Sequence, residues 1–397
     1  MLLTDIVYPS LKQTTSFYGP RKIIFGEDSR KDLAGEIRRL EGSKLLIVTY
    51  PEANQSRFVE DIMSVLQSEG TDFAVYSQTE PEPRIEIAED LATYTRTGRF
   101  DLIIGIGGGS VMDLAKIASM SIANLKPVRD YLGVDLLPKK GAPLVCIPTT
   151  AGTGSEVTMF SVLSVGKKKM DVVSPHILPD IALIDPLLTT TMPPQVTAGT
   201  GMDALSQAIE TVTSLATTPL TDSLALTAIQ LITKWLKVAY IDGNNIQARS
   251  GMALAATLSG LSFGSGKLTL GHSLAQTFGP VRKIPHGTSC GVALPYVMEF
   301  YLPVIPEKLS LIAAAMGLET RGATPQAGAA AIQAVMKLVE EVGVPSSLKE
   351  LGFNKGELSE LTETCVKEWP RPNSPRALTR EAVLEVLERM WEGKILT

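Results

Sequence analysis

Two histidines in the second half of the chain are the residues best suited to bind a metal ion. Only three histidines occur among the 397 residues, and His272 and His286 lie 14 positions apart. Upstream, Asp203 and Gln207 are four residues apart, a spacing that places both side chains on one face of a helix. One carboxylate and two imidazoles form a workable coordination shell for Zn or Fe. The alternative is that each histidine is a hydrogen-bonded structural residue.

A glycine-rich turn in the first half of the chain is a candidate phosphate site. Gly105–Ser110 (GIGGGS) directly follows an apolar run, and Ser110 with Asp113 three residues later resembles a helix capping box. Glycines let a phosphate approach the backbone, and the free amides of a helix N-terminus attract it. The run fits the GxGxxG dinucleotide fingerprint only loosely. The alternative is a strand-to-helix turn that binds no ligand.

A second loop is dense in hydroxyls and glycines. Pro148–Glu156 (PTTAGTGSE) follows another apolar segment, and its hydroxyls and amides can hydrogen-bond a nucleotide. An ordinary polar loop at the start of a helix has the same composition, so this alternative also stays open. The sequence AGTG at Ala151–Gly154 recurs at Ala198–Gly201, and both copies are interpreted as helix-entry loops.

Composition and charge exclude several classes of protein. Lys and Arg number 37 and Asp and Glu 42, so the net charge of −5 gives no general attraction to nucleic acid. With 44% hydrophobic and 20% charged residues, the chain can bury a large core. No apolar run approaches the roughly 18 residues of a membrane span, and no secretory signal is visible. The three cysteines form no CxxC motif, which indicates a reduced, cytoplasmic protein, and Cys290 is interpreted as core packing.

Strand-like and helix-like segments alternate up to about residue 192. The predicted strands are 44–50, 72–76, 101–106, 143–148 and 181–184, with helices at 57–69 and 85–97. This alternation predicts a parallel α/β sheet covered on both faces. Beyond Pro193 the periodicity is almost entirely helical, at 219–235, 245–263, 306–316, 325–342 and 379–391. We therefore predict an α/β nucleotide-binding domain over 1–192 and an all-α metal and substrate domain over 193–397.

Several motifs, taken in order, resemble those of the iron-containing (group III) alcohol dehydrogenases. They are GGGSxxDxxK at 107–116, PTTAGTGSE at 148–156, SPHILPDIALIDP at 174–186, TAGTGMDAL at 197–205, a histidine at 272 and PHG at 285–287. The resemblance covers essentially the whole chain. It implies the two-domain dehydroquinate synthase-like fold and reversible hydride transfer between a nicotinamide cofactor and a small alcohol or aldehyde. It also implies a homodimer or a larger homo-oligomer.

In the first domain the resemblance implies a site for NAD(P). The matching residues are Gly107, Gly108, Gly109 and Ser110 at the pyrophosphate with Asp113 in the same motif, Thr149, Thr150 and Thr153 along the cofactor, Lys169 near the ribose and Leu188 near the nicotinamide. The family often places an Asp after the second strand, where it repels a 2′-phosphate. Here the segment is Thr49-Tyr50-Pro51, so NADP is not excluded and is slightly favoured over NAD.

In the second domain the family has one Asp and three His as metal ligands. Asp203, His272 and His286 match three of these positions, but the remaining one is Gln207 in this chain. Three protein ligands remain, so Fe or Zn is still expected here, with the Gln207 amide oxygen as a weak fourth ligand. Because an amide is a poor ligand, the metal could bind more weakly or be absent. A further family histidine, which assists proton transfer, corresponds to Gln276, and an amide is no acid or base near neutral pH.

Cationic residues stand where the family has uncharged ones. Lys267 replaces a small residue, and Arg282 and Lys283 precede the second histidine motif. Phe263, Lys267, Gln276 and Arg282 are therefore the candidate substrate residues. The charges could bind an anionic tail such as a carboxylate, a sulfonate or a phosphonate, unless they are simply solvated at the surface. If no metal binds, Lys267 or the histidines must polarise the carbonyl.

Two other functions stay open at this point. A dehydroquinate synthase-like lyase shares the fold and the cofactor but consumes no net cofactor. A non-catalytic or metal-independent member of the family would have lost its metal together with the histidines that Gln207 and Gln276 replace.

Overall fold

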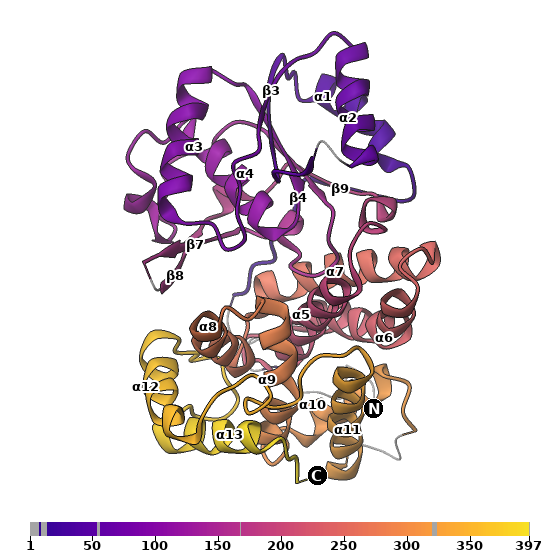
Figure 1. Cartoon of the computed structure of the whole chain (residues 1–397), viewed down its shortest axis with the longest axis vertical. Coiled ribbons are helices and arrows are strands. Elements are labelled where there is room, and N and C mark those ends of the chain that lie inside the picture. The colour runs from indigo at the N-terminus through magenta and orange to yellow at the C-terminus, as the bar shows by residue number, and fades with distance from the viewer. Residues whose placement is uncertain (1–7, 9–13, 54–55, 167, 320–323, 397) are drawn as a thin grey trace. The chain divides into compact units, whose positions relative to one another are not determined.

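The computed structural model describes residues 8, 14–53, 56–166, 168–319 and 324–396, which form two compact units (Figure 1). One unit is Tyr18–Thr191. The other contains the described residues from Met192 onward, together with the described N-terminal residues up to Phe17. The described residues among the first 17 positions therefore group with the helical unit, whereas the sequence analysis placed this stretch in the α/β domain. One contact that holds them there is the Lys308 ammonium, which lies 4.5 Å from the centroid of the Tyr8 ring.

The α/β unit is built on a six-stranded sheet in the order β1-β9-β6-β4-β2-β3, in which all neighbours are parallel. Its strands are β1 (Lys22–Phe25), β2 (Lys44–Thr49), β3 (Asp72–Tyr76), β4 (Leu102–Gly107), β6 (Leu144–Pro148) and β9 (Ile181–Ile184). The central strands are continuous apolar runs because both faces of a parallel sheet are buried. This confirms the predicted fold class for this half of the chain.

Alternate side chains of β2 pack on opposite faces of the sheet. Leu45 and Ile47 belong to the core that includes α1 (Leu33–Arg39) and α2 (Arg57–Ser68). Leu46 and Val48 belong to the core that includes α3 (Ile85–Gly98) and α4 (Gly109–Ser121). Helices therefore cover both faces, as the strand and helix alternation predicted.

A second, smaller sheet was not predicted. It contains β5 (Gly133–Val134), β8 (Lys168–Val173) and β7 (Phe160–Val165), and β7 and β8 form an antiparallel hairpin. The start of β8 is charged, so it carries no apolar run that would predict a strand. The hairpin matters for function because it brings Val162 and Lys169 close to the first turns of α4.

The second unit is helical. Its helices are α5 (Pro194–Thr213), α6 (Pro219–Ile241), α7 (Ile246–Gly266), α8 (Leu270–Arg282), α9 (His286–Tyr301), α10 (Pro306–Ala315), α11 (Pro325–Glu341), α12 (Leu358–Glu368) and α13 (Arg380–Glu392). Five of these overlap the predicted helices. Asp203 and Gln207 were placed on one helix face without bounds for α5, and no helix was predicted at α8, α9 or α12. The pattern is interrupted in α5 by Gly199 and Gly201, in α8 by Pro280 and in α9 by Pro295, and these three helices are buried on most sides.

One helix, α6, is long and apolar enough to cross a membrane by length and composition alone. In the structure it packs against α5 and α7, and Ala225, Ile229 and Ile232 are completely buried in that packing. These contacts are those of a core helix, which passes the same test of length and composition.

Candidate functional site

The glycine-rich turn and the hydroxyl-rich loop meet at the start of α4. This helix begins at Gly109, directly after β4, and its first turn carries no acidic side chain. A Cβ atom on Gly108 would lie 3.3 Å from Cγ2 of Thr150, and one on Gly109 would lie 2.8 Å from Cγ2 of Thr153. The two motifs thus form one surface beside a helix N-terminus, where free amides attract a phosphate.

The predicted capping box of Ser110 and Asp113 does not form. The residue before the helix is Gly108, and no side chain caps the first turn. Instead the Asp113 carboxylate accepts hydrogen bonds from Ser155 Oγ at 2.8 Å and from the Val162 amide at 3.1 Å. Burial raises the pKa of Asp113 even though Lys116 opposes this. Asp113 therefore joins α4 to the loop and to β7, and the prediction that it binds the cofactor directly is not supported by its contacts.

Lys116 is a buried residue of the same motif whose role the sequence did not reveal. Its side chain is completely buried and its ammonium donates to Ser155 Oγ at 2.8 Å and to the Phe160 carbonyl at 2.6 Å. Burial lowers the pKa of Lys116, although the neighbouring carboxylate of Asp113 counteracts the effect. Like Asp113, this lysine fixes the hydroxyl-rich loop against α4.

The other predicted cofactor residues are divided. The Thr149 amide donates to the Gly107 carbonyl at 3.0 Å, which places it at the glycine turn. The Lys169 ammonium lies 2.7 Å from Glu82 Oε1, and the Glu82 amide donates to Ser110 Oγ at 3.1 Å, so Lys169 is also near this turn. Leu188 is only 2% exposed and packs in the core on the α1 and α2 side. It therefore presents little surface to a nicotinamide.

Three predicted metal ligands converge in the helical unit from three different helices. Asp203 lies on α5, His272 on α8 and His286 at the first position of α9. Nε2 of His272 is 3.4 Å from Oδ1 of Asp203, and Nε2 of His286 is 3.8 Å from the same oxygen. Cys290, one helical turn after His286, places its Sγ 3.7 Å from both Nε2 atoms. All four donor atoms lie within 4.8 Å of one another.

The oxygen at the centre of this cluster fits a divalent cation. Oδ1 of Asp203 is buried and, within the described part of the chain, accepts no hydrogen bond. Buried polar atoms almost always have a partner, and an exception calls for an explanation such as an ion. Here two imidazole nitrogens and a sulfur surround the orphaned oxygen, and each of these donor types binds Zn or Fe.

A close crossing of α5 and α9 brings the ligands together. A Cβ atom on Gly287 would lie 2.1 Å from the Gly199 carbonyl oxygen and 3.1 Å from Cβ of Asp203. Only glycine permits this approach, and it sets Asp203 beside His286. The AGTG copy that contains Gly199 was predicted to be a helix-entry loop; it lies inside α5, and its glycine serves helix packing.

Glu210 orients the first histidine, a role that the sequence analysis missed. Oε1 of Glu210 is 2.6 Å from Nδ1 of His272, and Oε2 accepts from the Thr269 amide at 2.7 Å. A carboxylate on one ring nitrogen directs the other nitrogen toward a metal. Burial lowers the pKa of His272, but Cys290, Glu210 and Asp203 outweigh burial and hold this pKa well above its usual value. The spacing of residues 203, 207 and 210, which places them on one helix face, was the sequence signal that could have identified Glu210.

Gln207 lies beside the cluster and is bound to a neighbouring helix. Its Oε1 accepts a hydrogen bond of 3.1 Å from Ser259 Oγ on α7, and the side chain is 3% exposed. The same serine hydroxyl also contacts the Ala204 carbonyl at 2.8 Å. The amide oxygen predicted as a weak ligand is thus used in holding α5 against α7.

The predicted substrate residues do not act as one group. The Arg282 guanidinium is 2.7 Å from Glu357 Oε1 and lies 4.8 Å from the centroid of the Phe353 ring, so its charge is already paired. The structure therefore pairs Arg282 with a carboxylate of its own chain, and it does not show the predicted role with an anionic tail. Lys267 is exposed and ends α7 with a φ of +69°, and its amide donates to the Phe263 carbonyl at 2.9 Å.

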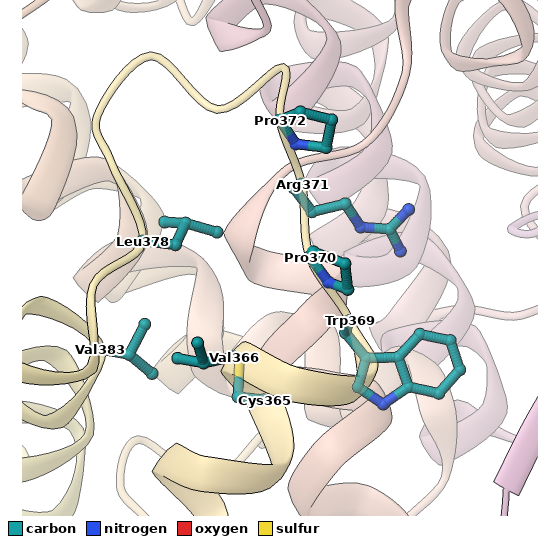
Figure 2. A pocket seen from close by; sticks show the side chains of 8 residues that line it. All are labelled: Cys365, Val366, Trp369, Pro370, Arg371, Pro372, Leu378 and Val383. Atoms are coloured by element: carbon teal, nitrogen blue, oxygen red, sulfur yellow. The ribbon is translucent and has the colours of Figure 1, made fainter.

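A different cation, Arg371, contacts α8 next to the metal cluster. Its Nη2 donates to Oε1 of Gln276 at 3.1 Å, and its Nε donates to Ser273 Oγ at 3.3 Å. Both of these partners are neutral, and Gln276 lies one turn after His272. Figure 2 shows that the Arg371 side chain points away from Leu378 and Val383, which line the opposite wall of a pocket of about 330 Å³.

Comparison with known proteins gives the class to which this fold and these two sites belong. Residues 20–186 match the family described as iron-containing alcohol dehydrogenase, and residues 197–391 match the C-terminal domain of the same family. Long-chain-alcohol dehydrogenase 1 of Geobacillus thermodenitrificans is 35% identical over 401 aligned residues, which cover 100% of this chain and 99% of that protein.

Solved structures agree with this assignment. A 1,3-propanediol oxidoreductase has a TM-score of 0.92 at 31% identity and covers 96% of this chain and 100% of its own. A sulfoacetaldehyde reductase from Bifidobacterium kashiwanohense, in complex with NAD+, has a TM-score of 0.87 at 29% identity and covers 95% and 99%. The chain belongs to the iron-containing alcohol dehydrogenase family. It is an NAD(P)-dependent oxidoreductase, which confirms the predicted family, fold and enzyme class.

Proposed function

We propose that this chain interconverts a small aldehyde and its primary alcohol at a divalent metal held by Asp203, His272 and His286. The observation that carries the proposal is the convergence of two imidazole nitrogens on a buried, unsatisfied carboxylate oxygen, at 3.4 Å and 3.8 Å. When bound, the ion supplies Lewis acidity toward the carbonyl oxygen and the nicotinamide supplies or accepts the hydride.

The residues of the chain bind and orient the reactants. The amides at the start of α4, with Gly108, Gly109, Thr150 and Thr153 around them, bind the pyrophosphate of the cofactor. Gln276 cannot exchange a proton near neutral pH, so the alcohol proton comes from water or from a cofactor hydroxyl. We therefore expect kcat to depend less on pH than in an enzyme in which a histidine assists proton transfer.

The proposal is tested by following NAD(P)H absorbance in the presence of a panel of small aldehydes, before and after removal of metal by chelation. Stoichiometric oxidation of NAD(P)H that is lost on chelation and restored by Fe(II) or Zn(II) supports it. Product formation without net NAD(P)H oxidation would indicate the lyase. Tight cofactor binding without turnover, after reconstitution, would indicate a non-catalytic member. Full turnover without metal would make Lys267 the first candidate for polarising the carbonyl.

We further propose that the substrate carries an anionic tail, which Arg371 binds. The support is its guanidinium, whose two contacts on α8 are to the neutral groups of Gln276 and Ser273. A structural relative named for reduction of sulfoacetaldehyde shows that the family includes such substrates. A charge-assisted hydrogen bond contributes about 1.5–3 kcal/mol, which corresponds to roughly a 10- to 100-fold change in KM.

The variant Arg371→Met should raise KM for sulfonate or carboxylate aldehydes by about tenfold or more and leave KM for neutral aldehydes nearly unchanged. Arg282→Met is the matched control, because its guanidinium is already paired with Glu357. A loss of activity that is equal for neutral and anionic aldehydes would contradict a role in tail recognition.

For the cofactor, we propose that NADPH is used at least as well as NADH. The support is the segment Thr49-Tyr50-Pro51, which follows β2 without a carboxylate that would repel a 2′-phosphate. Comparing kcat/KM for the two reduced cofactors tests this, and a tenfold preference for NADH would contradict it.

We also propose a cytoplasmic homodimer or larger homo-oligomer. Cys146, Cys290 and Cys365 are buried free thiols, as expected in a reducing compartment. The edge strand β1 exposes Ile23 and Phe25 at 40% and 39%, and such an edge favours pairing with a second copy. Light scattering coupled to size exclusion tests the oligomeric state, and a monomer at micromolar concentration would contradict it.

A further inference from the structure

We propose that Cys290 is a fourth ligand of the metal and replaces the histidine that the family has at Gln207. This inference rests on the metal site proposed above and concerns which side chains complete it. The thiol is completely buried, and its Sγ is 3.7 Å from Nε2 of His272 and 3.7 Å from Nε2 of His286. The sequence alone did not mark Cys290, because two of its neighbours in the site, Asp203 and His272, come from other helices.

Four of the six distances between donor atoms are close to the edges of one coordination tetrahedron. With Zn–N and Zn–O bonds of about 2.0–2.1 Å and a Zn–S bond of about 2.3 Å, ideal edges are about 3.4 Å for nitrogen to oxygen and about 3.6 Å for sulfur to nitrogen. The observed nitrogen to oxygen distances are 3.4 Å and 3.8 Å, and both sulfur to nitrogen distances are 3.7 Å. The other two donor pairs lie within 4.8 Å, so the four protein atoms are close enough to one another to bind a single ion.

Helix geometry explains why the sulfur and not the amide completes this set. Cys290 follows His286 by four residues on α9, so both side chains lie on one face of that helix. The close crossing at Gly287 and Gly199 turns this face toward Asp203. The amide oxygen of Gln207, by contrast, accepts a hydrogen bond from Ser259. The glutamine thus remains beside the site as a support between α5 and α7.

A thiolate changes both the preferred metal and the charge of the site. Metal binding exchanges the thiol proton of Cys290 for a sulfur–metal bond, and the proton is released to solvent. With the Asp203 carboxylate, the two anionic ligands neutralise a divalent ion. An Asp and three His would leave one positive charge. Because thiolates are soft ligands, the same change favours zinc over Fe(II). We therefore infer that this chain binds zinc in preference to iron.

Substitution with Co(II) tests the ligand directly through its absorption spectrum. Cobalt bound to a thiolate gives an intense sulfur-to-metal charge-transfer band in the near ultraviolet, whereas oxygen and nitrogen ligands alone give only the weaker visible bands. The variants are Cys290→Ser and, as a matched control, Cys365→Ser, another buried cysteine of the same unit that lies outside the cluster. Circular dichroism and cofactor binding establish that each variant is folded.

We expect the charge-transfer band in the wild-type chain and in Cys365→Ser but not in Cys290→Ser, which should also bind Zn(II) at least about tenfold more weakly. A wild-type chain that shows visible cobalt bands without the charge-transfer band would overturn the ligand and leave the metal-dependent reductase intact. A band that persists in Cys290→Ser would overturn it as well. If no cobalt binds, the metal site itself is wrong. The wild-type spectrum decides the question even if Cys290→Ser fails to fold.

Discussion

Replacing Glu210 by Gln should weaken the metal site without unfolding the helical unit. The Glu210 carboxylate contacts Nδ1 of His272 at 2.6 Å and accepts from the Thr269 amide at 2.7 Å and the His272 amide at 3.3 Å. A glutamine amide oxygen keeps an acceptor for the backbone amides but removes the negative charge beside the imidazole. Loss of such a partner typically costs 10- to 100-fold in metal affinity, which is about 1.4–2.7 kcal/mol.

Competition with a chromophoric chelator measures this change as a dissociation constant for Zn(II). Glu299→Gln provides the control, because Glu299 is also a buried carboxylate of the same unit but accepts a hydrogen bond from Arg389, at 3.0 Å, and contacts no metal ligand. We expect Glu210→Gln to lose affinity while its melting temperature without metal stays within a few degrees of the control. Unchanged zinc affinity in Glu210→Gln would refute the assignment of Glu210 as the residue that orients His272.

Three further changes test other parts of the account. Gly109→Val places a branched side chain where a Cβ atom would already lie 2.8 Å from Cγ2 of Thr153. The affinity for NADPH, measured by fluorescence titration, should therefore fall by about tenfold or more. Unchanged affinity would argue against the glycine turn as the cofactor site. Lys308→Met leaves the completely buried Asp222 carboxylate without the ammonium that lies 2.6 Å away. The free energy of unfolding, measured by urea titration, should fall by about 3 kcal/mol. A decrease of less than about 1 kcal/mol would contradict this role of the ion pair. Burial raises the pKa of Asp101, but the Ser43 hydroxyl and the amides of Lys44 and Ser43 outweigh burial and lower this pKa below its usual 3.8. The stability that this carboxylate contributes is therefore present above about pH 4 and is lost as pH falls through the lowered pKa. Asp101→Ala should cost about 1 kcal/mol at pH 7, after allowance for solvent screening, and the cost should shrink toward pH 3, whereas a difference that does not depend on pH would contradict the assignment.

The sequence predicted the α/β unit well because buried parallel strands leave an unmistakable pattern. The segment 72–76 coincides with β3, and 181–184 coincides with β9. The β7 and β8 hairpin was missed because β8 begins with charged residues and so lacks a continuous apolar run. In the helical unit, Asp203 and Gln207 were placed on a helix, but the first turns of α5 were predicted as a loop and α9 was not predicted as a helix. Their glycines look like breaks in a single sequence, and only the structure reveals that Gly199 and Gly287 let two buried helices cross.

The candidate site was predictable where one segment carries the chemistry and unpredictable where distant segments meet. The motifs at 107–110 and 148–156 meet at the turn that we propose for the cofactor, and Asp203, His272 and His286 lie together in the structure. The contacts of Arg282 with Glu357 and of Arg371 with Gln276 join residues 75 and 95 positions apart, so no local pattern could assign them. For that reason the sequence analysis named Arg282 for the substrate tail, whereas the contacts in the structure lead us to propose Arg371.

Metal dependence of the reductase is tested most directly by the metal content per chain of anaerobically purified, untagged protein, measured together with its NAD(P)H-dependent aldehyde reductase activity before and after chelation. We expect about one zinc or iron per chain, lost together with activity and recovered when the metal is restored. Full reductase activity in protein that contains no metal would contradict it, and so would a metal that stays bound after Asp203, His272 and His286 are all replaced by alanine.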